Sequence, residues 1–496
     1  MSKDLINLSI LARLKFLFKD SIVYGAASAI SKAFGLITFP IIARNLSIAD
    51  FGFYDYLISV LVFFTIIVQF GQDSSIARFY YEYENKLKRQ KFISQSLFFQ
   101  IFCFLIILLI FSIFPDEIKK ILFFDRKEEN LIFFLVLNIP FQLFISFSQN
   151  ILRWSFKRSE FLFMSLGYTF FQTIFIMFLL YFDKMSVINL FKAYISLNII
   201  FSLLGIFLIR QYIIIIKDFK GFKEILFFAL PFGIIGVLAS LSATVERNLS
   251  HSIFGEDALG FYAAAFKISI LISLLVNAFH VSWGPFSMSI YKDKNVVETY
   301  NLILKVFSLI ILISTLILTI ISPLIIELLA SSKYLSIVNL IFPLTLACGI
   351  RGISWITEIG ISLSKKTYLS LISHSVQFLV TILLIYFFSS YFGLISIALS
   401  VLIGQLTRSI IESYYAQKTY PLKWDYNPVI KMISLTIIFG IISEIIRIFH
   451  GDFYSLSSYF IGLLLLIYFG FNFLFSENEL KKINEAKRNF ILSIKK

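Results

Sequence analysis

Residues 44–54 read RNLSIADFGFY, and residues 247–262 read RNLSHSIFGEDALGFY. An R-N-L-S element followed by G-F-Y therefore occurs twice, roughly 200 residues apart, which is the mark of an internal duplication. In both copies the first element closes one apolar run and the second opens the next. The fold is therefore predicted to contain two similar halves, each with a pair of apolar segments joined in this way.

The composition of the chain excludes a water-soluble protein. The chain has 496 residues, of which 58% are hydrophobic and 15% are charged, and its mean hydropathy is +0.86. Soluble domains are roughly 45–50% apolar and about 25% charged. Cys103 and Cys348 both lie inside apolar runs, so the sequence indicates neither a disulfide framework nor a metal-binding spacing.

Apolar runs long enough to cross a membrane follow one another along the chain. A span needs about 20 mostly apolar residues to cross roughly 30 Å of hydrocarbon. The runs are continuous rather than alternating, which predicts an all-α polytopic protein. About fourteen segments qualify, and they are 22–43, 53–70, 92–114, 131–150, 161–182, 187–209, 225–245, 259–283, 302–325, 336–357, 368–388, 391–411, 429–449 and 454–475. Because an even number of spans separates the two copies, both halves have the same orientation, as in transporters built from parallel repeats.

The Lys and Arg residues between the spans indicate the orientation. They are concentrated at both termini and in the even-numbered connections, which predicts that both termini lie in the cytoplasm. Much of the net charge of +14 therefore comes from basic residues on the predicted cytoplasmic side of the membrane. No nucleic-acid partner is predicted. The predicted order is a cytoplasmic amphipathic segment 1–21, an N-terminal lobe 22–210, a cytoplasmic linker 211–224, a C-terminal lobe 225–411, a cytoplasmic loop 412–428, two further helices 429–475 and a basic tail 476–496.

Three basic residues, Lys32, Lys267 and Arg351, lie inside predicted spans. A charge that faces lipid at the centre of a span costs about 2.5–3.5 kcal/mol or more, so each should face a cavity or a partner. These three residues are the candidates for binding an anion, and the alternative for each is a structural pair with a buried carboxylate. Basic residues near span ends, where a long side chain can reach the interface, are Lys192, Lys305 and Arg408.

Acidic residues in or near the spans are fewer, and any of them could carry a coupling proton or Na⁺. The candidates at the repeated motifs and at the end of the second span are Asp55, Asp73 and Glu246. Other acids near span ends are Glu327, Glu358, Glu412 and Glu444. The sequence does not indicate which of these acidic residues carries the coupling ion.

The sequence lacks the signatures of an enzyme. It has no G-x-x-x-x-G-K-[ST] loop, so ATP is not expected to drive the protein directly. It has no G-x-S-x-G or H-E-x-x-H motif and no long extracytoplasmic loop that could hold a catalytic pair of acids. The prediction is a transporter that uses no cofactor and no metal, apart from a coupling ion.

Segment 71–80, GQDSSIARFY, strongly resembles polysaccharide biosynthesis membrane proteins. These are the Wzx-type lipid-linked oligosaccharide flippases of the MOP (multidrug/oligosaccharidyl-lipid/polysaccharide) superfamily. The likeness extends from Tyr24-Gly25 through Lys32 to the first G-F-Y motif, and to Glu246-Arg247 and the second motif. The family more usually has Asp at the position of Glu246.

The resemblance implies a MATE-like arrangement of two six-helix lobes around a central cavity, followed by two extra C-terminal helices. It implies a flippase of the bacterial cytoplasmic (inner) membrane that moves undecaprenyl-pyrophosphate-linked oligosaccharide by alternating access, driven by a Na⁺ or H⁺ gradient. The family's basic cavity residues map onto Lys32, Lys267 and Arg351. Arg78 and Arg247 match motif positions and would serve as gate, substrate contact or structural residue. The implied partners are the polyprenyl-pyrophosphate-linked glycan, membrane lipids, a glycan polymerase and chain-length proteins.

Other functions remain open at this point. The sequence only weakly distinguishes an oligosaccharide flippase from a lipid II flippase of the same superfamily. A drug/cation antiporter should have acidic residues deep in its cavity, whereas the deepest charges here are basic. A membrane glycan polymerase or ligase should have a large external loop, and a non-transporting scaffold would not need duplicated halves with charged spans.

Overall fold

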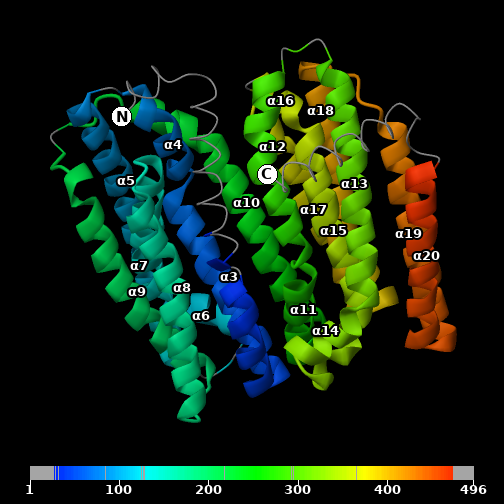
Figure 1. The fold of residues 1–496 in the computed structure, drawn as a ribbon. Coiled ribbons are helices and arrows are strands. Elements are labelled where there is room, and N and C mark those ends of the chain that lie inside the picture. Colours follow the sequence, from blue (N-terminus) through cyan, green and yellow to red (C-terminus); the bar gives the residue numbers. More distant parts are fainter. Residues whose placement is uncertain are drawn as a thin grey trace, which may run out of the picture. The chain divides into compact units, whose positions relative to one another are not determined.

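The computed structural model describes residues 27, 30, 31 and 33–472, apart from 84, 125, 127, 128, 217, 292, 294 and 365. Within this part of the chain the regular elements are helices and none is a strand (Figure 1). The predicted amphipathic segment 1–21, the candidate Lys32 and the basic tail 476–496 lie outside the described residues.

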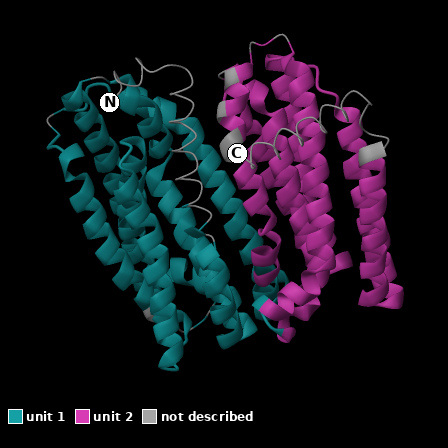
Figure 2. Cartoon of the chain, in the orientation of Figure 1, with its two compact units in different colours: residues 1–263, 329–331 teal, residues 264–328, 332–496 magenta. Residues whose placement is uncertain are grey.

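The chain divides into two compact units (Figure 2). Unit 1 consists of residues 1–263 and 329–331, and unit 2 consists of residues 264–328 and 332–496. The helices of unit 1 are α3 (Ile48–Gln69), α4 (Gln72–Glu82), α5 (Lys86–Ile113), α6 (Pro115–Phe123), α7 (Glu129–Trp154), α8 (Arg158–Tyr181), α9 (Val187–Ile209), α10 (Phe222–Phe254) and the first part of α11 (Glu256–Ser269).

Unit 2 begins within α11 and continues to the C-terminal end of the described chain. Its other helices are α12 (Ile272–Ile290), α13 (Val296–Ile320), α14 (Ser322–Leu329), α15 (Val338–Thr357), α16 (Ile359–Leu363), α17 (Leu369–Phe392), α18 (Ile395–Thr419), α19 (Tyr426–His450) and α20 (Asp452–Asn472). The two helices expected after the repeat correspond to α19 and α20, which pack on each other and on α13.

The described chain contains twelve helices long and apolar enough to cross a membrane, or thirteen if one bent pair counts as a span. The bent pair is Glu256–Ser269 and Ile272–His280, joined at 46°, so the predicted span 259–283 is broken. Helix Ala33–Asn45 is a shorter apolar segment that overlaps the end of the predicted span 22–43. The predicted all-α polytopic fold is confirmed, and the count of fourteen is approximate.

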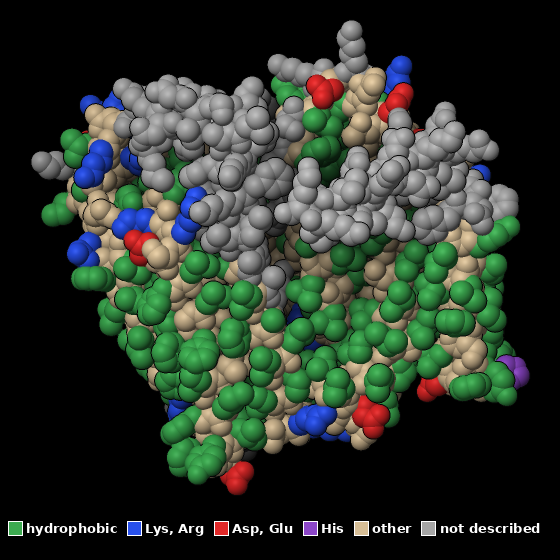
Figure 3. Space-filling model, viewed as in Figure 1, with side chains coloured by type: hydrophobic (Ala, Val, Ile, Leu, Met, Phe, Trp, Pro, Cys, Tyr) green, Lys and Arg blue, Asp and Glu red, His purple; other side chains and the backbone are tan. Residues whose placement is uncertain are grey.

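The surface matches a lipid environment. On the face shown in Figure 3, hydrophobic side chains cover the middle of the helices, and most charged side chains gather toward the helix ends. Exposed residues include Leu109 on α5 and Leu383 and Phe387 on α17, each more than half exposed. Helices satisfy their own backbone hydrogen bonds, which allows such a surface to lie in hydrocarbon. The protein is therefore a multi-pass membrane protein.

The compact units do not follow the predicted lobes 22–210 and 225–411. Helix α10 packs along α3 and α4, and these contacts place it in unit 1, so the division falls at residue 263 rather than before α10. Helix α18 also continues to Thr419, well into the predicted loop 412–428. Its last turns remain helical because Ala416 is buried in a small apolar cluster with Ile361 and Leu369.

Helix α3, which carries the first G-F-Y motif, starts earlier than the predicted residue 53. Ser47 caps α3 by accepting a hydrogen bond from the Asp50 backbone N–H at 3.0 Å, so the helix begins at Ile48. A Ser at this position satisfies one of the otherwise unpaired donors of the first turn. Asp55 consequently lies in the interior of α3, where it is only 2% exposed, and not at the start of the span.

A sharp break separates α3 from α4 at Phe70 and Gly71, both in the left-handed region. Gly71 has φ of +72°, and a Cβ there would lie 2.3 Å from the Ala229 carbonyl oxygen of α10. Only glycine combines this backbone conformation with so close an approach. Segment 71–80, which carries the family resemblance, therefore forms most of α4 and is held against α10.

Candidate functional site

The two copies of the repeated motif meet where α3 crosses α10 and α11, all within unit 1. A Cβ on Gly52 would lie 2.3 Å from the Gly260 backbone nitrogen, and a Cβ on Gly260 would lie 2.0 Å from the Ile48 carbonyl oxygen. The two helix backbones are thus in direct contact at the matching glycines. Small residues allow this approach between membrane helices. We call the crossing and the charged residues around it the motif junction, comprising Gly52, Asp55, Glu246, Arg247 and Gly260.

A buried ion pair joins the two helices beside this crossing. The Arg247 Nε donates a hydrogen bond to the Asp55 Oδ2 at 2.7 Å, and the two side chains are 6% and 3% exposed. The Arg247 Nη1 also donates to the Ala243 carbonyl oxygen one turn back, at 2.9 Å. Removing one partner of a buried pair leaves an uncompensated charge, which typically costs about 3–5 kcal/mol. The pair therefore fastens α3 to α10.

Glu246 connects α10 to the second copy of the motif. Its carboxylate accepts a hydrogen bond from the Tyr262 hydroxyl of α11 at 2.8 Å and another from the Ser242 hydroxyl at 3.0 Å. Glu246 and Tyr262 are both buried. The neighbouring residues Glu246 and Arg247 thus point to different helices, and together they join α3, α10 and α11.

Arg126 completes the motif junction from the connection between α6 and α7. Its guanidinium bridges Asp50 at 2.8 Å and Glu256 at 2.6 Å, and it lies 4.6 Å from the centre of the Phe53 ring. Burial alone lowers the pKa of Arg126, but hydrogen bonds and attraction from the two carboxylates outweigh it and raise the pKa. Arg126 thus bridges the first turns of α3 and α11 as a permanent cation. Sequence reasoning missed it because it lies in a connection with charges of both signs.

The predicted acid Asp73 and the predicted base Arg78 lie on α4, beyond the far end of α3 from the motif junction. Asp73 lines a small polar recess in unit 1. Arg78 is half exposed, forms a pair with Glu82 at 3.6 Å and lies over the Phe228 ring of α10 at 4.5 Å. The structure therefore brings together Asp55, Glu246 and Arg247, and it separates them from Asp73 and Arg78.

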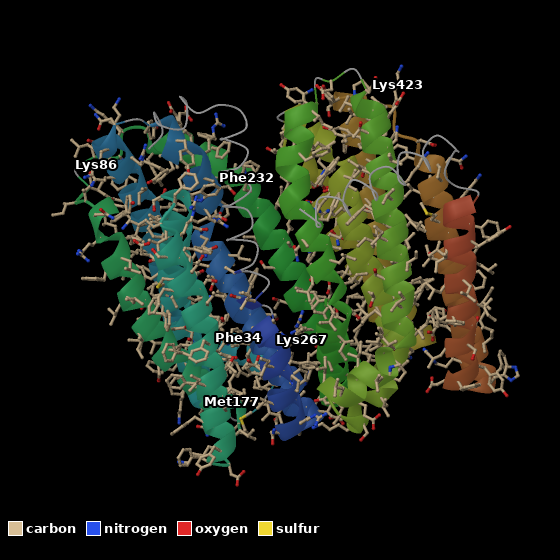
Figure 4. All side chains as sticks on the ribbon, viewed as in Figure 1. Phe34, Lys86, Met177, Phe232, Lys267 and Lys423 are labelled. Atoms are coloured by element: carbon tan, nitrogen blue, oxygen red, sulfur yellow. The ribbon has the colours of Figure 1, made fainter. Side chains whose placement is uncertain are left out.

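The predicted anion-binding residues that the structure describes both lie in unit 2. Lys267 is on α11 and is partly exposed (Figure 4). Arg351 is on α15 and is exposed, with its guanidinium 6.0 Å from the Trp355 ring. The imidazole ring of His280 on α12 packs on the Trp355 ring, with the two ring centres 3.9 Å apart. An exposed guanidinium beside an aromatic ring can bind a phosphate group.

Two basic residues assigned to span ends are buried and paired with carboxylates. Lys305 is 5% exposed and pairs with Asp425 at 2.9 Å. Arg408 is 7% exposed and pairs with Glu412 one turn later, at 3.0 Å. Each therefore has a carboxylate within hydrogen-bonding distance, and the partner of Lys305 is about half exposed in the connection before α19. Lys192 is exposed, as expected.

The structure thus shows a helical membrane protein whose duplicated motifs cross beside a buried ion pair. Comparison with known families is consistent with this class. Residues 17–290, more than half of the chain, match the family described as "Polysaccharide biosynthesis protein". The chain belongs to this family.

Relatives and solved structures agree with the assignment. The chain is 25% identical to a Haemophilus influenzae protein named for the Lsg locus, over 56% of this chain and 68% of that protein. A solved structure of lipid II flippase MurJ in an inward closed conformation covers 90% of this chain and 98% of its own, at 18% identity and a TM-score of 0.66. An inward-facing MATE transporter of the MOP superfamily covers 78% and 94%, at 14% identity and a TM-score of 0.63.

These matches confirm the family resemblance and the MATE-like fold predicted from the sequence. The solved structures that share this fold are those of a flippase and a MATE transporter. The structural matches concern the fold, because their sequence identities are low.

Proposed function

We propose that this protein is a flippase that moves polyprenyl-pyrophosphate-linked oligosaccharide from the cytoplasmic to the outer leaflet of the bacterial cytoplasmic membrane. Membership of a polysaccharide biosynthesis family and a fold shared with a lipid II flippase support this proposal. The observation that carries it is the placement of Lys267 and Arg351 within apolar stretches of α11 and α15. Lys32 is a third candidate of the same kind, outside the described residues.

The chemistry of the cargo explains these basic residues. A pyrophosphate that crosses a membrane needs fixed positive charge, and attraction between charges grows as the local dielectric constant falls. The lysine ammonium holds a phosphate as a point charge, whereas an arginine can hold two oxygens at once. The polyprenyl tail can stay in lipid while only the polar head crosses. A glycan polymerase and chain-length proteins would then receive the product.

In this proposal, the contacts of the motif junction stabilise one conformational state of the transporter. Alternating access requires helices that hold together in one state and separate in another. The Asp55–Arg247 pair and the glycine crossing hold α3 against α10 and α11, so another state would have to break or replace these contacts. The energy to do so would come from a gradient of Na⁺ or H⁺.

Lipid II is the second candidate cargo. The likeness to the MurJ structure over 90% of this chain supports it. Both cargoes carry a pyrophosphate, so the basic residues serve either one. Competition between the two glycolipids in purified vesicles distinguishes them.

Loss of a basic side chain should reduce export. We expect Lys267→Ala and Arg351→Ala each to lower surface glycan about tenfold, the effect of losing one charged contact worth roughly 1.5 kcal/mol. Lys192→Ala, an exposed lysine on α9, is the matched control and should leave export unchanged. Surface glycan is measured in cells with equal amounts of membrane-inserted protein. Normal glycan in the double variant of Lys267 and Arg351 would refute their role.

The proposed orientation is tested by cysteine labelling. In a chain lacking Cys103 and Cys348, Lys184→Cys lies in the exposed turn after α8 and Lys418→Cys lies near the end of α18. An impermeant maleimide should label the first in intact cells and the second only after permeabilisation. The reverse pattern would show that the termini are extracytoplasmic.

A further inference from the structure

The polar recess that Asp73 lines in unit 1 is separate from the motif junction and from Lys267 and Arg351. It lies among α3, α4, α5 and α7, which pack on one another. Its polar lining consists of Gln69, Asp73, Gln100, Ser146 and Asn150. Each of these side chains carries at least one oxygen atom, and Asp73 is the single acid among them. The recess therefore combines several oxygen atoms with one negative charge.

The break between α3 and α4 places Asp73 at this recess. Gln69 is the last residue of α3, and Asp73 lies in the first turn of α4. Between them the chain turns sharply, because Phe70 and Gly71 are both in the left-handed region. The last backbone hydrogen bond of α3 joins the Phe70 N–H to the Ile66 carbonyl oxygen at 2.9 Å. The carbonyl end of a helix carries partial negative charge, which favours a cation beside Gln69.

Gln100 brings a buried oxygen atom to the recess from α5. The side chain is 2% exposed, and its Oε1 receives no hydrogen bond from any donor group of the described residues. Gln95, another buried amide of α5, is engaged instead, because its Nε2 donates to the Asp218 carbonyl oxygen at 2.8 Å. Most buried polar atoms in proteins have a partner, so an unpartnered oxygen that lines a recess indicates a binding position.

Hydrogen bonds fix the wall of the recess on the side of α7. The Gln69 Nε2 donates to the Ser146 Oγ at 2.7 Å, which uses a hydrogen atom of Gln69 and leaves its amide oxygen available. The Asn150 Oδ1 accepts a hydrogen bond from the Arg153 Nη2 at 2.7 Å, so this oxygen already has a donor. Gln69 and Ser146 therefore remain as ligands, and Asn150 is a wall residue.

The carboxylate of Asp73 has no basic partner. None of the ion pairs formed by the described residues includes it. Arg78, five residues later on α4, pairs with Glu82 at 3.6 Å. A carboxylate without a basic partner attracts a cation from solution, and the attraction grows where the surroundings exclude water.

We propose that the polar recess binds one Na⁺ ion, held by the Asp73 carboxylate and the Gln100 Oε1, with oxygen atoms of Gln69 and Ser146 as further ligands. Oxygen ligands without nitrogen or sulfur select hard cations. A single carboxylate balances one positive charge, whereas dedicated Ca²⁺ sites use several carboxylates. A proton joins only two of these oxygen atoms, but a metal ion contacts several at once.

Binding at this position joins four helices. Gln69 belongs to α3, Asp73 to α4, Gln100 to α5 and Ser146 to α7. The ion therefore ties the break between α3 and α4 to the two neighbouring helices. Without it, the negative charge of Asp73 is not compensated, which favours a more open recess. Its use as the coupling ion rests on the proposed function, but the binding of Na⁺ does not.

The test is equilibrium binding of radioactive Na⁺ to the purified full-length protein, with choline replacing Na⁺ at constant ionic strength. Wild-type protein should bind Na⁺ saturably. Asp73→Asn should weaken binding about tenfold or more, because it removes the one negative charge. Gln100→Leu, which has a similar volume but no oxygen, should also weaken it. Glu82→Gln is the matched control, because Glu82 is an exposed carboxylate of the same helix and does not line the recess.

Each outcome decides the proposal. Absence of saturable binding by folded wild-type protein, or an unchanged affinity in Asp73→Asn, overturns it. An equal loss in Glu82→Gln also overturns it, because binding would then reflect the surface charge of α4. If Asp73→Asn does not fold, Gln100→Leu alone decides. Binding of Na⁺ at the recess without glycan transport would refute the proposed function and leave the site intact, and transport without Na⁺ binding would do the reverse.

Discussion

Replacing Arg247 by Ala is expected to lower the free energy of unfolding by about 3–5 kcal/mol, because it removes the guanidinium that donates to the buried Asp55 carboxylate. The expected consequence in cells is loss of glycan export. Unfolding is measured by denaturant titration of the purified protein in micelles, and export is measured as surface glycan. The size of the effect follows from the burial of both side chains, which are 6% and 3% exposed.

The chain contains its own control for this change. Arg44 occupies the same position of the R-N-L-S element in the first copy, but its side chain is exposed. Arg44→Ala should therefore have a much smaller effect on stability than Arg247→Ala. The double variant Asp55→Ala with Arg247→Ala removes both charges and should be more stable than the sum of the single effects predicts. Strictly additive effects would show that the two residues do not act as a pair.

Replacing Gly260 by Ala is expected to cost about 3 kcal/mol, at the upper end of the usual cost of overpacking a close-packed site. The added Cβ would lie 2.0 Å from the Ile48 carbonyl oxygen, which is backbone and cannot rotate away. Helices α3 and α11 would have to separate. We expect less folded protein in the membrane, measured by size-exclusion chromatography of the solubilised protein, and a lower midpoint of unfolding.

Gly35→Ala is the matched control for this prediction. Gly35 is also a helical glycine near the start of the chain, but a Cβ there would meet no atom within 4 Å. Alanine is favoured over glycine within a helix by up to about 1 kcal/mol. Gly35→Ala should therefore leave the protein as stable as before or slightly more so. Equal losses in both variants would mean that the glycine crossing is not the cause.

Hydropathy and the internal repeat predicted most of the fold, because the signals that define them are local. Each apolar run predicts one helix, and the repeated R-N-L-S and G-F-Y elements predict that the two halves of the chain are equivalent. The contact between Gly52 and Gly260 could not be read from the same pattern, because equivalence in sequence does not imply proximity. The start of α3 at Ile48 had a readable signal in Ser47 and Asp50, which cap the first turn.

The candidate site was predicted in part. Asp55, Glu246 and Arg247 were identified singly, but the pair of Asp55 with Arg247 joins residues 192 apart and depends on how α10 packs on α3. The ion pair of Arg408 was not predicted, because a basic residue near the end of a span looks the same in sequence whether or not it meets a buried acid. Its partner Glu412, four residues later on the same helix face, was the signal that could have shown the difference.

The most direct test of the central claim is transport by the purified protein. The protein is reconstituted into vesicles with a fluorescent polyprenyl-pyrophosphate-linked oligosaccharide, and an impermeant quencher reports the fraction in the outer leaflet. We predict that wild-type protein moves the glycolipid between leaflets, and that Lys267→Ala and Arg351→Ala slow this movement while Lys192→Ala does not. Movement no faster than in protein-free vesicles, with correctly folded wild-type protein and an imposed ion gradient, would contradict the account.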